Sequence, residues 1–184
     1  MTSPLTVPRL IAGDKFLLRP WELADLPLIR EASDDEYIPL ITTVPSAYSV
    51  EAAEDFVRRQ WERAENGTGY PFVIARRDDG RPLGSIGLWL KDVGAGRAST
   101  GYWVVESSRG QGAAAAALRT LATWALADLR IPRLHLYVEA WNAASHRTAE
   151  RVGFQREGLL RSWQQVGGER RDMISYSMLA ADLP

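Results

Sequence analysis

The sequence of 184 residues contains no cysteine and only two histidines. Without cysteine the chain has no disulfide bond, no thiolate metal ligand and no cysteine nucleophile, so acyl transfer through a cysteine-bound intermediate is excluded. The two histidines have no set of carboxylates near them in the sequence, so we expect no metal site. These absences remove thiol and metal chemistry from the candidate functions.

Long apolar segments are absent as well. No apolar run approaches the roughly 18 residues that identify a membrane-spanning helix, and residues 1–10 lack the apolar centre of a signal peptide. We therefore expect a cytoplasmic protein that does not act on a membrane. The charges nearly cancel, with 22 Lys and Arg against 23 Asp and Glu, so nothing indicates that the chain binds nucleic acid.

The length fits one domain, and 46% hydrophobic with 24% charged residues is typical of a globular protein with a sizeable core. We expect an N-terminal extension at residues 1–13 and one domain at residues 14–183. Hydrophobic periodicity and turn residues predict an α/β or α+β sheet with helices packed on it. The predicted strands are residues 15–19, 70–75, 83–90, 99–105, 134–138, 154–161 and 172–179; the predicted helices are residues 22–32, 50–65, 112–129 and 143–152.

One segment carries a recognisable chemical pattern: Arg109-Gly110-Gln111-Gly112-Ala113-Ala114 follows a predicted strand and opens a predicted helix. The first backbone N–H groups of a helix have no internal partner and carry partial positive charge, which suits a phosphate group. The glycines permit unusual dihedrals and a close approach of the backbone to a ligand, and the arginine can pair with phosphate oxygens. The segment is therefore a candidate pyrophosphate-binding loop.

Taken alone, this pattern has a second interpretation, a glycine-rich turn before an alanine-rich helix. Two other nucleotide-binding motifs are missing from the sequence. The chain has no Gly-x-x-x-x-Gly-Lys-Ser/Thr loop, and no Gly-x-Gly-x-x-Gly motif follows a strand with an acidic residue at the required distance. Phosphate transfer and dinucleotide binding are therefore disfavoured.

A second segment strengthens the first interpretation. Asn142-Ala143-Ala144-Ser145 opens a predicted helix, Val152-Gly153-Phe154 closes it, and Glu157-Gly158 follows. Together with Arg-x-x-Gly-x-Ala at residues 109–114, this order resembles the GCN5-related N-acetyltransferases (GNAT), in particular the branch that contains the ribosomal-protein N-terminal acetyltransferases. Residues 16–20 and 84–87 fit the same branch, so the resemblance covers residues 14–183.

The resemblance implies a GNAT fold, which is a single α/β (α+β) domain with a mixed, mostly antiparallel sheet of about seven strands and about four helices. It implies an N-acetyltransferase that moves acetyl from acetyl-CoA, its co-substrate, to a primary amine by direct attack in a ternary complex, without a metal. Backbone groups of the strand before the loop would contact the pantetheine arm, the loop would hold the pyrophosphate, and Asn142 would contact the cofactor arm or simply cap its helix. The candidate cofactor-binding residues are Val104, Val105, Arg109, Gly110, Gln111, Gly112, Ala113, Ala114 and Asn142.

Ser145 is the candidate catalytic acid, because it matches a position near the thioester sulfur where a hydroxyl can protonate the departing thiolate. Its alternative role is a hydrogen bond to the first helical turn. The branch often supplies a carboxylate that deprotonates the amine, but Gln164 and Gln165 stand where some members carry glutamate. We place Glu106, beside the loop, in the candidate site. Glu139 at a strand end and proton release to bulk water are the alternatives.

Two other functions remain open from the sequence. The missing glutamate at residues 164–165 also fits a non-catalytic acyl-CoA sensor or an interaction module of the same fold. The donor can also be succinyl-CoA or another acyl-CoA, because the volume of a pocket cannot be read from a sequence. The acceptor is a protein N-terminus or a small-molecule amine, and a homodimer fits the branch.

Overall fold

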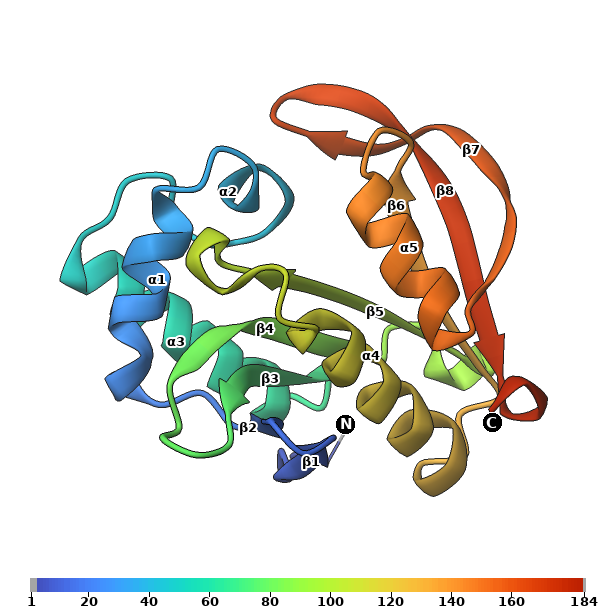
Figure 1. Cartoon of the computed structure of the whole chain (residues 1–184), viewed down its shortest axis with the longest axis horizontal. Coiled ribbons are helices and arrows are strands. Elements are labelled where there is room, and N and C mark those ends of the chain that lie inside the picture. Colours follow the sequence, from blue (N-terminus) through green and yellow to red (C-terminus); the bar gives the residue numbers. More distant parts are fainter. Residues whose placement is uncertain (1–2, 184) are drawn as a thin grey trace.

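The computed structural model of the chain describes residues 3–183, which form one eight-stranded sheet in the order β1-β2-β3-β4-β5-β6-β8-β7 (Figure 1). Neighbouring strands are antiparallel except β5 and β6, which run parallel. The strands are β1 (Leu10–Ala12), β2 (Phe16–Arg19), β3 (Gly69–Arg76), β4 (Pro82–Trp89), β5 (Arg97–Val104), β6 (Arg133–Glu139), β7 (Gln155–Val166) and β8 (Glu169–Leu179).

Helices cover both faces of the sheet. Three of them, α1 (Leu26–Ser33), α2 (Ile38–Ile41) and α3 (Val50–Glu65), lie on one face, and α4 (Ala113–Thr123) and α5 (Ala143–Val152) lie on the other. Successive residues of β3 alternate between the two cores, as expected of a strand that is buried on both faces. Within residues 3–183 no helix has both the length and the apolar character needed to cross a membrane.

The helix ends follow their local sequence signals. The Ser49 hydroxyl caps α3 by accepting a hydrogen bond from the Ala52 N–H at 3.0 Å. The Asn142 side chain caps α5 in the same way, through the Ser145 N–H at 3.1 Å. Gly153 ends α5 in the left-handed region with a φ of 110°, where glycine avoids the strain that a side chain brings. These three boundaries confirm the sequence-based predictions.

The predicted order of elements is confirmed, and the structure adds details that the sequence did not reveal. β1, which lies within residues 1–13, pairs with β2 at the edge of the sheet, and three residues are too few to show a strand period. The four-residue α2 lies between the predicted helices 22–32 and 50–65, where no helix was predicted. The predicted helix 112–129 is α4 followed by a π-helical segment, η4 (Trp124–Asp128), and the β7–β8 hairpin is longer than predicted.

The strands β5 and β6 pair only at their beginnings. The parallel register joins residues 97–99 to residues 133–135 and then ends. Beyond that point β6, β7, β8 and α5 lean away from β1–β5, as Figure 1 shows. The edge of β5 that faces β6 therefore has no strand partner along residues 100–104 of the described chain. Such an edge offers backbone N–H and C=O groups to a ligand.

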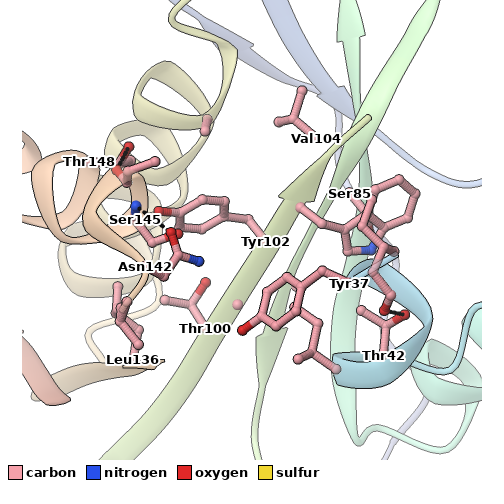
Figure 2. Close-up of a pocket in the computed structure, with 18 of the residues that line it drawn as sticks. Tyr37, Thr42, Ser85, Thr100, Tyr102, Val104, Leu136, Asn142, Ser145 and Thr148 are labelled. Carbon is pink, nitrogen blue, oxygen red and sulfur yellow. Dashed lines mark hydrogen bonds between the residues drawn. The ribbon is translucent and has the colours of Figure 1, made fainter. Parts of the chain in front are cut away.

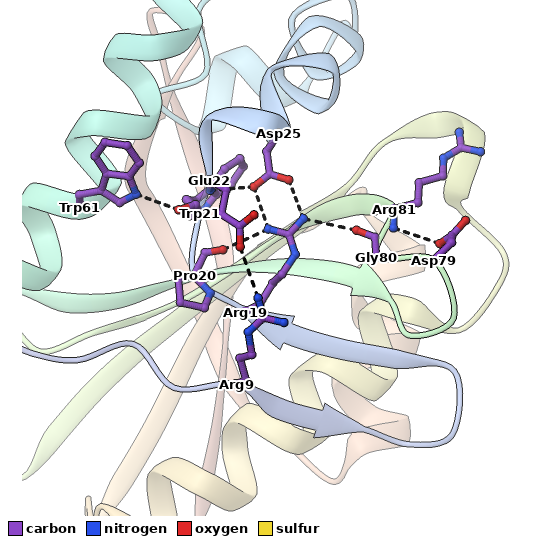
Figure 3. A network of polar contacts seen from close by, with 10 residues as sticks. All are labelled: Arg9, Arg19, Pro20, Trp21, Glu22, Asp25, Trp61, Asp79, Gly80 and Arg81. Carbon is purple, nitrogen blue, oxygen red and sulfur yellow. Dashed lines mark hydrogen bonds and ion pairs between the residues drawn. The ribbon is translucent and has the colours of Figure 1, made fainter.

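A buried ion pair fixes the first turn of the domain (Figure 3). Arg19, the last residue of β2, donates to both carboxylate oxygens of Asp25, at 2.9 and 2.6 Å. It also donates to the carbonyls of Pro20 and Gly80, while Asp25 accepts from the Glu22 N–H at 2.9 Å. The Arg19 and Asp25 side chains are 8% and 1% exposed. The network joins β2 to the turn before α1 and to the turn between β3 and β4.

Candidate active site

A cavity of about 1140 Å³ passes through the sheet where β5 and β6 diverge. Both faces of β5 line it: Tyr102 and Val104 face α4 and α5, whereas Gly101 and Trp103 face α3. We call the part lined by α4 and α5 the α4 lobe. The part lined by α2, α3 and the adjoining face of β4 and β5 is the α3 lobe. Since the lobes meet between the strands, ligands bound on opposite faces of the sheet can touch each other.

The loop before α4 opens toward the α4 lobe. Gly110 and Gly112 have positive φ values of 78° and 85°, and a Cβ at either position would meet no atom within 4 Å. Residues 113–115 line the cavity, and their N–H groups precede the first helical hydrogen bond, which runs from Ala116 N to Gly112 O at 3.0 Å. The loop therefore presents open backbone donors and the positive end of a helix to the cavity.

Arg109 lies at the rim of this loop. Its Nε donates to the Val104 carbonyl at 3.0 Å, and its Nη2 donates to the Asp35 carboxylate at 2.5 Å. Burial acts to raise the pKa of Asp35, but hydrogen bonds from the Ile38 and Tyr37 N–H groups and from Arg109 hold that pKa below its usual value. The Arg109 side chain is half exposed and lines the cavity, so it can also reach an anionic ligand.

Three hydroxyl groups lie close together where the strands diverge: those of Tyr102 on β5 and of Ser145 and Thr148 on α5 (Figure 2). The hydroxyls of Tyr102 and of the neighbouring Thr100 are buried and have no hydrogen-bond partner among residues 3–183. Burial raises the pKa of Tyr102, and the nearby Ser145 and Thr148 hydroxyls, which lie close without completing a hydrogen bond, oppose this rise. Tyr102 therefore keeps its proton at neutral pH, and a ligand in the cavity would offset the cost of its unpaired hydroxyl.

Glu139, at the end of β6, is the one carboxylate that lines the cavity within the described residues, and it is only 4% exposed. Its Oε1 accepts a hydrogen bond from the Tyr37 hydroxyl at 2.7 Å, and its Oε2 accepts one from Trp141 Nε1 at 2.8 Å. Burial and the Glu139 carboxylate raise the pKa of Tyr37. The two aromatic rings pack edge to face with centroids 4.9 Å apart, so they hold the carboxylate in a fixed position.

The structure brings most of the predicted site residues to this cavity. Val105 is instead buried in the core between the sheet and α1–α3, and the Gln111 side chain is exposed. Glu106 is exposed and does not line the cavity, because it begins the turn η3 (Glu106–Ser108) beyond the end of β5. The predicted residues that line the cavity are Val104, Arg109, Gly110, Gly112, Ala113, Ala114, Asn142 and Ser145.

Other cavity residues were missed by reasoning from the sequence. Side chains alternate along a strand, so Tyr102, two residues before the predicted Val104, faces the same side of β5. This alternation could have identified Tyr102 from the sequence. Arg147 and Arg151 are four residues apart on α5, a spacing that puts both on one side of the helix. Arg63 on α3 gave no signal, because only the packing of α3 on the sheet brings it to the cavity.

The α4 lobe has the groups that a coenzyme A thioester requires. The open N–H groups of residues 113–115 and the Arg109 guanidinium suit a pyrophosphate, and the unpaired edge of β5 suits the amides of a pantetheine arm. The unpaired Thr100 and Tyr102 hydroxyls offer further hydrogen bonds. Nowhere in residues 3–183 do three or more His, Asp or Glu side chains gather in a way that would hold a metal ion.

Comparison with known protein sequences agrees with these features of the α4 lobe. The sequence model of the acetyltransferase (GNAT) domain matches residues 15–155. The chain is 25% identical over 166 residues to the uncharacterized N-acetyltransferase p20 of Bacillus licheniformis, and this alignment covers 90% of the chain and 93% of that protein.

Solved structures share the fold. The structure of RimJ of Mycobacterium smegmatis in complex with CoA-disulfide matches with a TM-score of 0.82 and 28% identity, over 100% of this chain and 92% of that one. The ribosomal L7/L12 alpha-N-protein acetyltransferase RimL in complex with coenzyme A matches with a TM-score of 0.82 and 20% identity, over 94% and 98% of the two chains. These matches confirm the predicted fold, and with the match of the domain model they show that the chain belongs to the GNAT family of acetyltransferases.

Proposed function

We propose that this protein transfers the acetyl group of acetyl-CoA to a primary amine by direct attack in a ternary complex. The observation that carries the proposal is the cavity through the sheet, which joins an anion-binding loop in the α4 lobe to the buried Glu139 carboxylate in the α3 lobe. The coenzyme A present in the RimJ and RimL structures supports this choice of donor.

The donor occupies the α4 lobe in this proposal. Arg109 and the loop through Ala114 hold the pyrophosphate, and Asn142 contacts the cofactor arm. The Val104 backbone binds the pantetheine, since this end of β5 has no partner on the β6 side. Val105 does not take part, because its N–H donates to the Leu83 carbonyl and its carbonyl accepts from the Ser108 N–H. Arg147 and Arg151 line the same cavity and add positive charge for the phosphate groups.

The reaction takes place where the lobes meet. Glu139 accepts the proton of the ammonium group, directly or through water, and the free amine attacks the thioester carbonyl carbon. The tetrahedral intermediate then loses its C–S bond, and the proton still carried by its nitrogen passes through the Ser145 or Tyr102 hydroxyl to the departing coenzyme A thiolate, giving the neutral amide and the free thiol. Glu139 takes the role of base in place of Glu106, because Glu139 lines the cavity and Glu106 does not.

The second candidate function is a non-catalytic acyl-CoA sensor. Its motivation is the pair Gln164 and Gln165, which line the cavity where a glutamate would supply the base. Glu139 supplies a carboxylate from a different strand, and this observation favours the enzyme over the sensor.

Thiol release from acetyl-CoA in the presence of a panel of amines tests the proposal, with coenzyme A binding measured separately as thermal stabilisation. We expect amine-dependent release, and an affinity for coenzyme A about tenfold lower in Arg109→Ala, because a charged hydrogen bond is worth ~1.5 kcal/mol or more. Arg119→Ala is the matched control, since Arg119 is exposed on α4 and outside the cavity. Binding without thiol release from any amine would identify a sensor, and the absence of both would contradict either function.

A further inference from the structure

We infer that the amine acceptor also carries an anionic group, a carboxylate or a phosphate, and that Arg63 of α3 binds this group. The inference rests on the proposed function, because it concerns the molecule that receives the acetyl group. It makes Arg63 a specificity-determining residue of the α3 lobe.

Arg63 lines the cavity without an acidic partner. Its guanidinium carbon lies 5.1 Å from the centroid of the Trp89 ring. Its Nη1 donates to the Gln60 side-chain oxygen at 2.6 Å, and its Nη2 donates to the Thr43 hydroxyl at 3.4 Å. Both acceptors are neutral, and none of the ion pairs among residues 3–183 includes Arg63. Its positive charge is therefore held in place but not compensated.

The surroundings make this charge costly. Burial lowers the pKa of Arg63, and the nearby positive charge of Arg59 lowers it further. Arginine nevertheless stays protonated in proteins, so a partly desolvated cation with unused N–H donors faces the cavity. An anionic group bound there would accept those hydrogen bonds and compensate the charge.

The floor beneath Arg63 is shaped by two glycines and an indole ring. A Cβ on Gly87 would lie 2.2 Å from Trp89 Cζ2, so the Trp89 ring lies directly over this glycine. Gly101 pairs with Gly87 across β4 and β5, and a Cβ on Gly101 would meet no atom within 4 Å. The cavity therefore has an open floor between the diverging strands and Trp89, along which a small acceptor can extend toward Arg63.

The charges of the α3 lobe are arranged for a molecule with two charged groups. In the described chain, Glu139 is the one carboxylate that lines the cavity, and Arg63 is the one arginine that lines it from α3. The other lining arginines, Arg109, Arg147 and Arg151, belong to the loop before α4 and to α5, on the coenzyme A side. Arg63 is therefore left for the acceptor, with Glu139 at the amine and Arg63 at the anion.

Matched pairs of acceptors test the inference on the full chain with saturating acetyl-CoA. The carboxylate arm compares ω-amino acids of increasing length with their primary amides, and the phosphate arm compares aminoalkyl phosphates with the corresponding amino alcohols. For one of the two arms we expect kcat/KM to be about tenfold or more higher for the anionic member of a pair. Whichever arm shows the preference identifies the anionic group.

The variant Arg63→Gln should lose this preference by lowering kcat/KM for the anionic member alone. Arg63→Lys, which keeps the charge without the forked donors, should retain part of it and guards against a folding defect. Arg59→Gln is the matched control, because Arg59 lies one turn earlier on α3 and does not line the cavity. Equal use of charged and neutral acceptors by the unmodified protein, or an equal loss for both in Arg63→Gln, would overturn the inference.

Failure of the proposed function would give a different result. If no amine releases thiol, thermal stabilisation of the coenzyme A-bound protein by the same compounds still tests Arg63. The anionic compounds should then stabilise the unmodified protein and the Arg59→Gln variant but not Arg63→Gln. Stabilisation of all three proteins alike would show that Arg63 does not bind the anion.

Discussion

At the scale of single residues, the Glu139 carboxylate makes the sharpest prediction. Replacing it with glutamine keeps its size and one acceptor oxygen but removes the ability to take a proton. We expect Glu139→Gln to lower kcat by about 100-fold or more, since positioned general bases typically contribute that much. Glu106→Gln should leave kcat unchanged, because Glu106 is exposed outside the cavity. Steady-state thiol release measures both variants.

Tyr37→Phe separates a structural role of Glu139 from a chemical one. It removes the 2.7 Å hydrogen bond to Glu139 but leaves the carboxylate and its contact with Trp141 in place. A small change in kcat would confirm the chemical role. If Tyr37→Phe lost as much activity as Glu139→Gln, Glu139 would act only by holding the site together.

Residues placed by local backbone geometry could be predicted from the sequence, whereas residues placed by contacts between distant segments could not. The glycines at 110 and 112 and the cap at Asn142 depend on local backbone geometry, so the sequence was sufficient to predict them. Glu106 was predicted from its proximity to the loop along the chain, but η3 carries it past the strand end. The setting of Glu139 depends on Tyr37, which is far away in the sequence, and no local pattern encodes that contact.

At the scale of elements, the divergence of β5 from β6 forms the site, and Gly101 tests it. Leucine at this position would extend into empty space without a backbone clash, and so would fill the cavity between the strands. We expect Gly101→Leu to lower kcat/KM for the amine by about 100-fold, since misplacing reacting groups by ~1 Å has an effect of that size. The affinity for coenzyme A should change little. Gly94→Leu is the control, because it also meets no atoms but lies outside the cavity.

The buried ion pair of Arg19 and Asp25 stabilises the elements that precede the site along the chain, because it joins β2 to the turn before α1. In Asp25→Ala the Arg19 guanidinium stays buried without its partner, so we expect the free energy of unfolding to fall by about 3–5 kcal/mol. Glu22→Gln removes the exposed pair with Arg9 and a weaker charge interaction with Arg19 but leaves the Arg19–Asp25 pair intact, so it should cost less than about 1 kcal/mol. Urea unfolding measures both variants, and similar losses would contradict the importance of burial.

Hydrophobic period and turn residues predicted the long elements, because these signals extend over many residues. They did not predict β1 or α2, which have three and four residues. That backbone groups of β5, which diverges from β6, are free to contact a cofactor was expected only from the family resemblance. Both strands are regular in sequence, and the separation depends on how α5, β7 and β8 pack.

At the scale of the whole molecule, folding concentrates charge that the composition conceals. The net charge is only -1, yet the cavity is lined by four arginines and one carboxylate within the described residues. A nearly neutral chain can therefore build a local anion site. Net charge bears on binding to large polyanions, but it does not reveal the chemistry of a small-ligand site.

The stability of the molecule should also depend on pH through His135 on β6. Burial lowers the pKa of His135, with the positive charges of Arg133 and Arg97 adding to the effect and Asp92 and Glu157 opposing it. The unfolded chain therefore binds this proton more readily than the folded one. By linkage, the free energy of unfolding decreases as the pH falls through about 6.5, the ordinary pKa of histidine.

Urea unfolding on both sides of that pH tests this for the unmodified protein and for His135→Gln. The substitution can change stability at every pH. The comparison between the two proteins therefore uses only the change in the free energy of unfolding between neutral and mildly acidic pH. We expect this difference to be smaller in His135→Gln, because its side chain cannot take up a proton on unfolding. An unchanged difference would assign the pH dependence to other groups. Asp35 is not among them at mildly acidic pH, because its lowered pKa makes the fold less stable only below the ordinary aspartate value of 3.8.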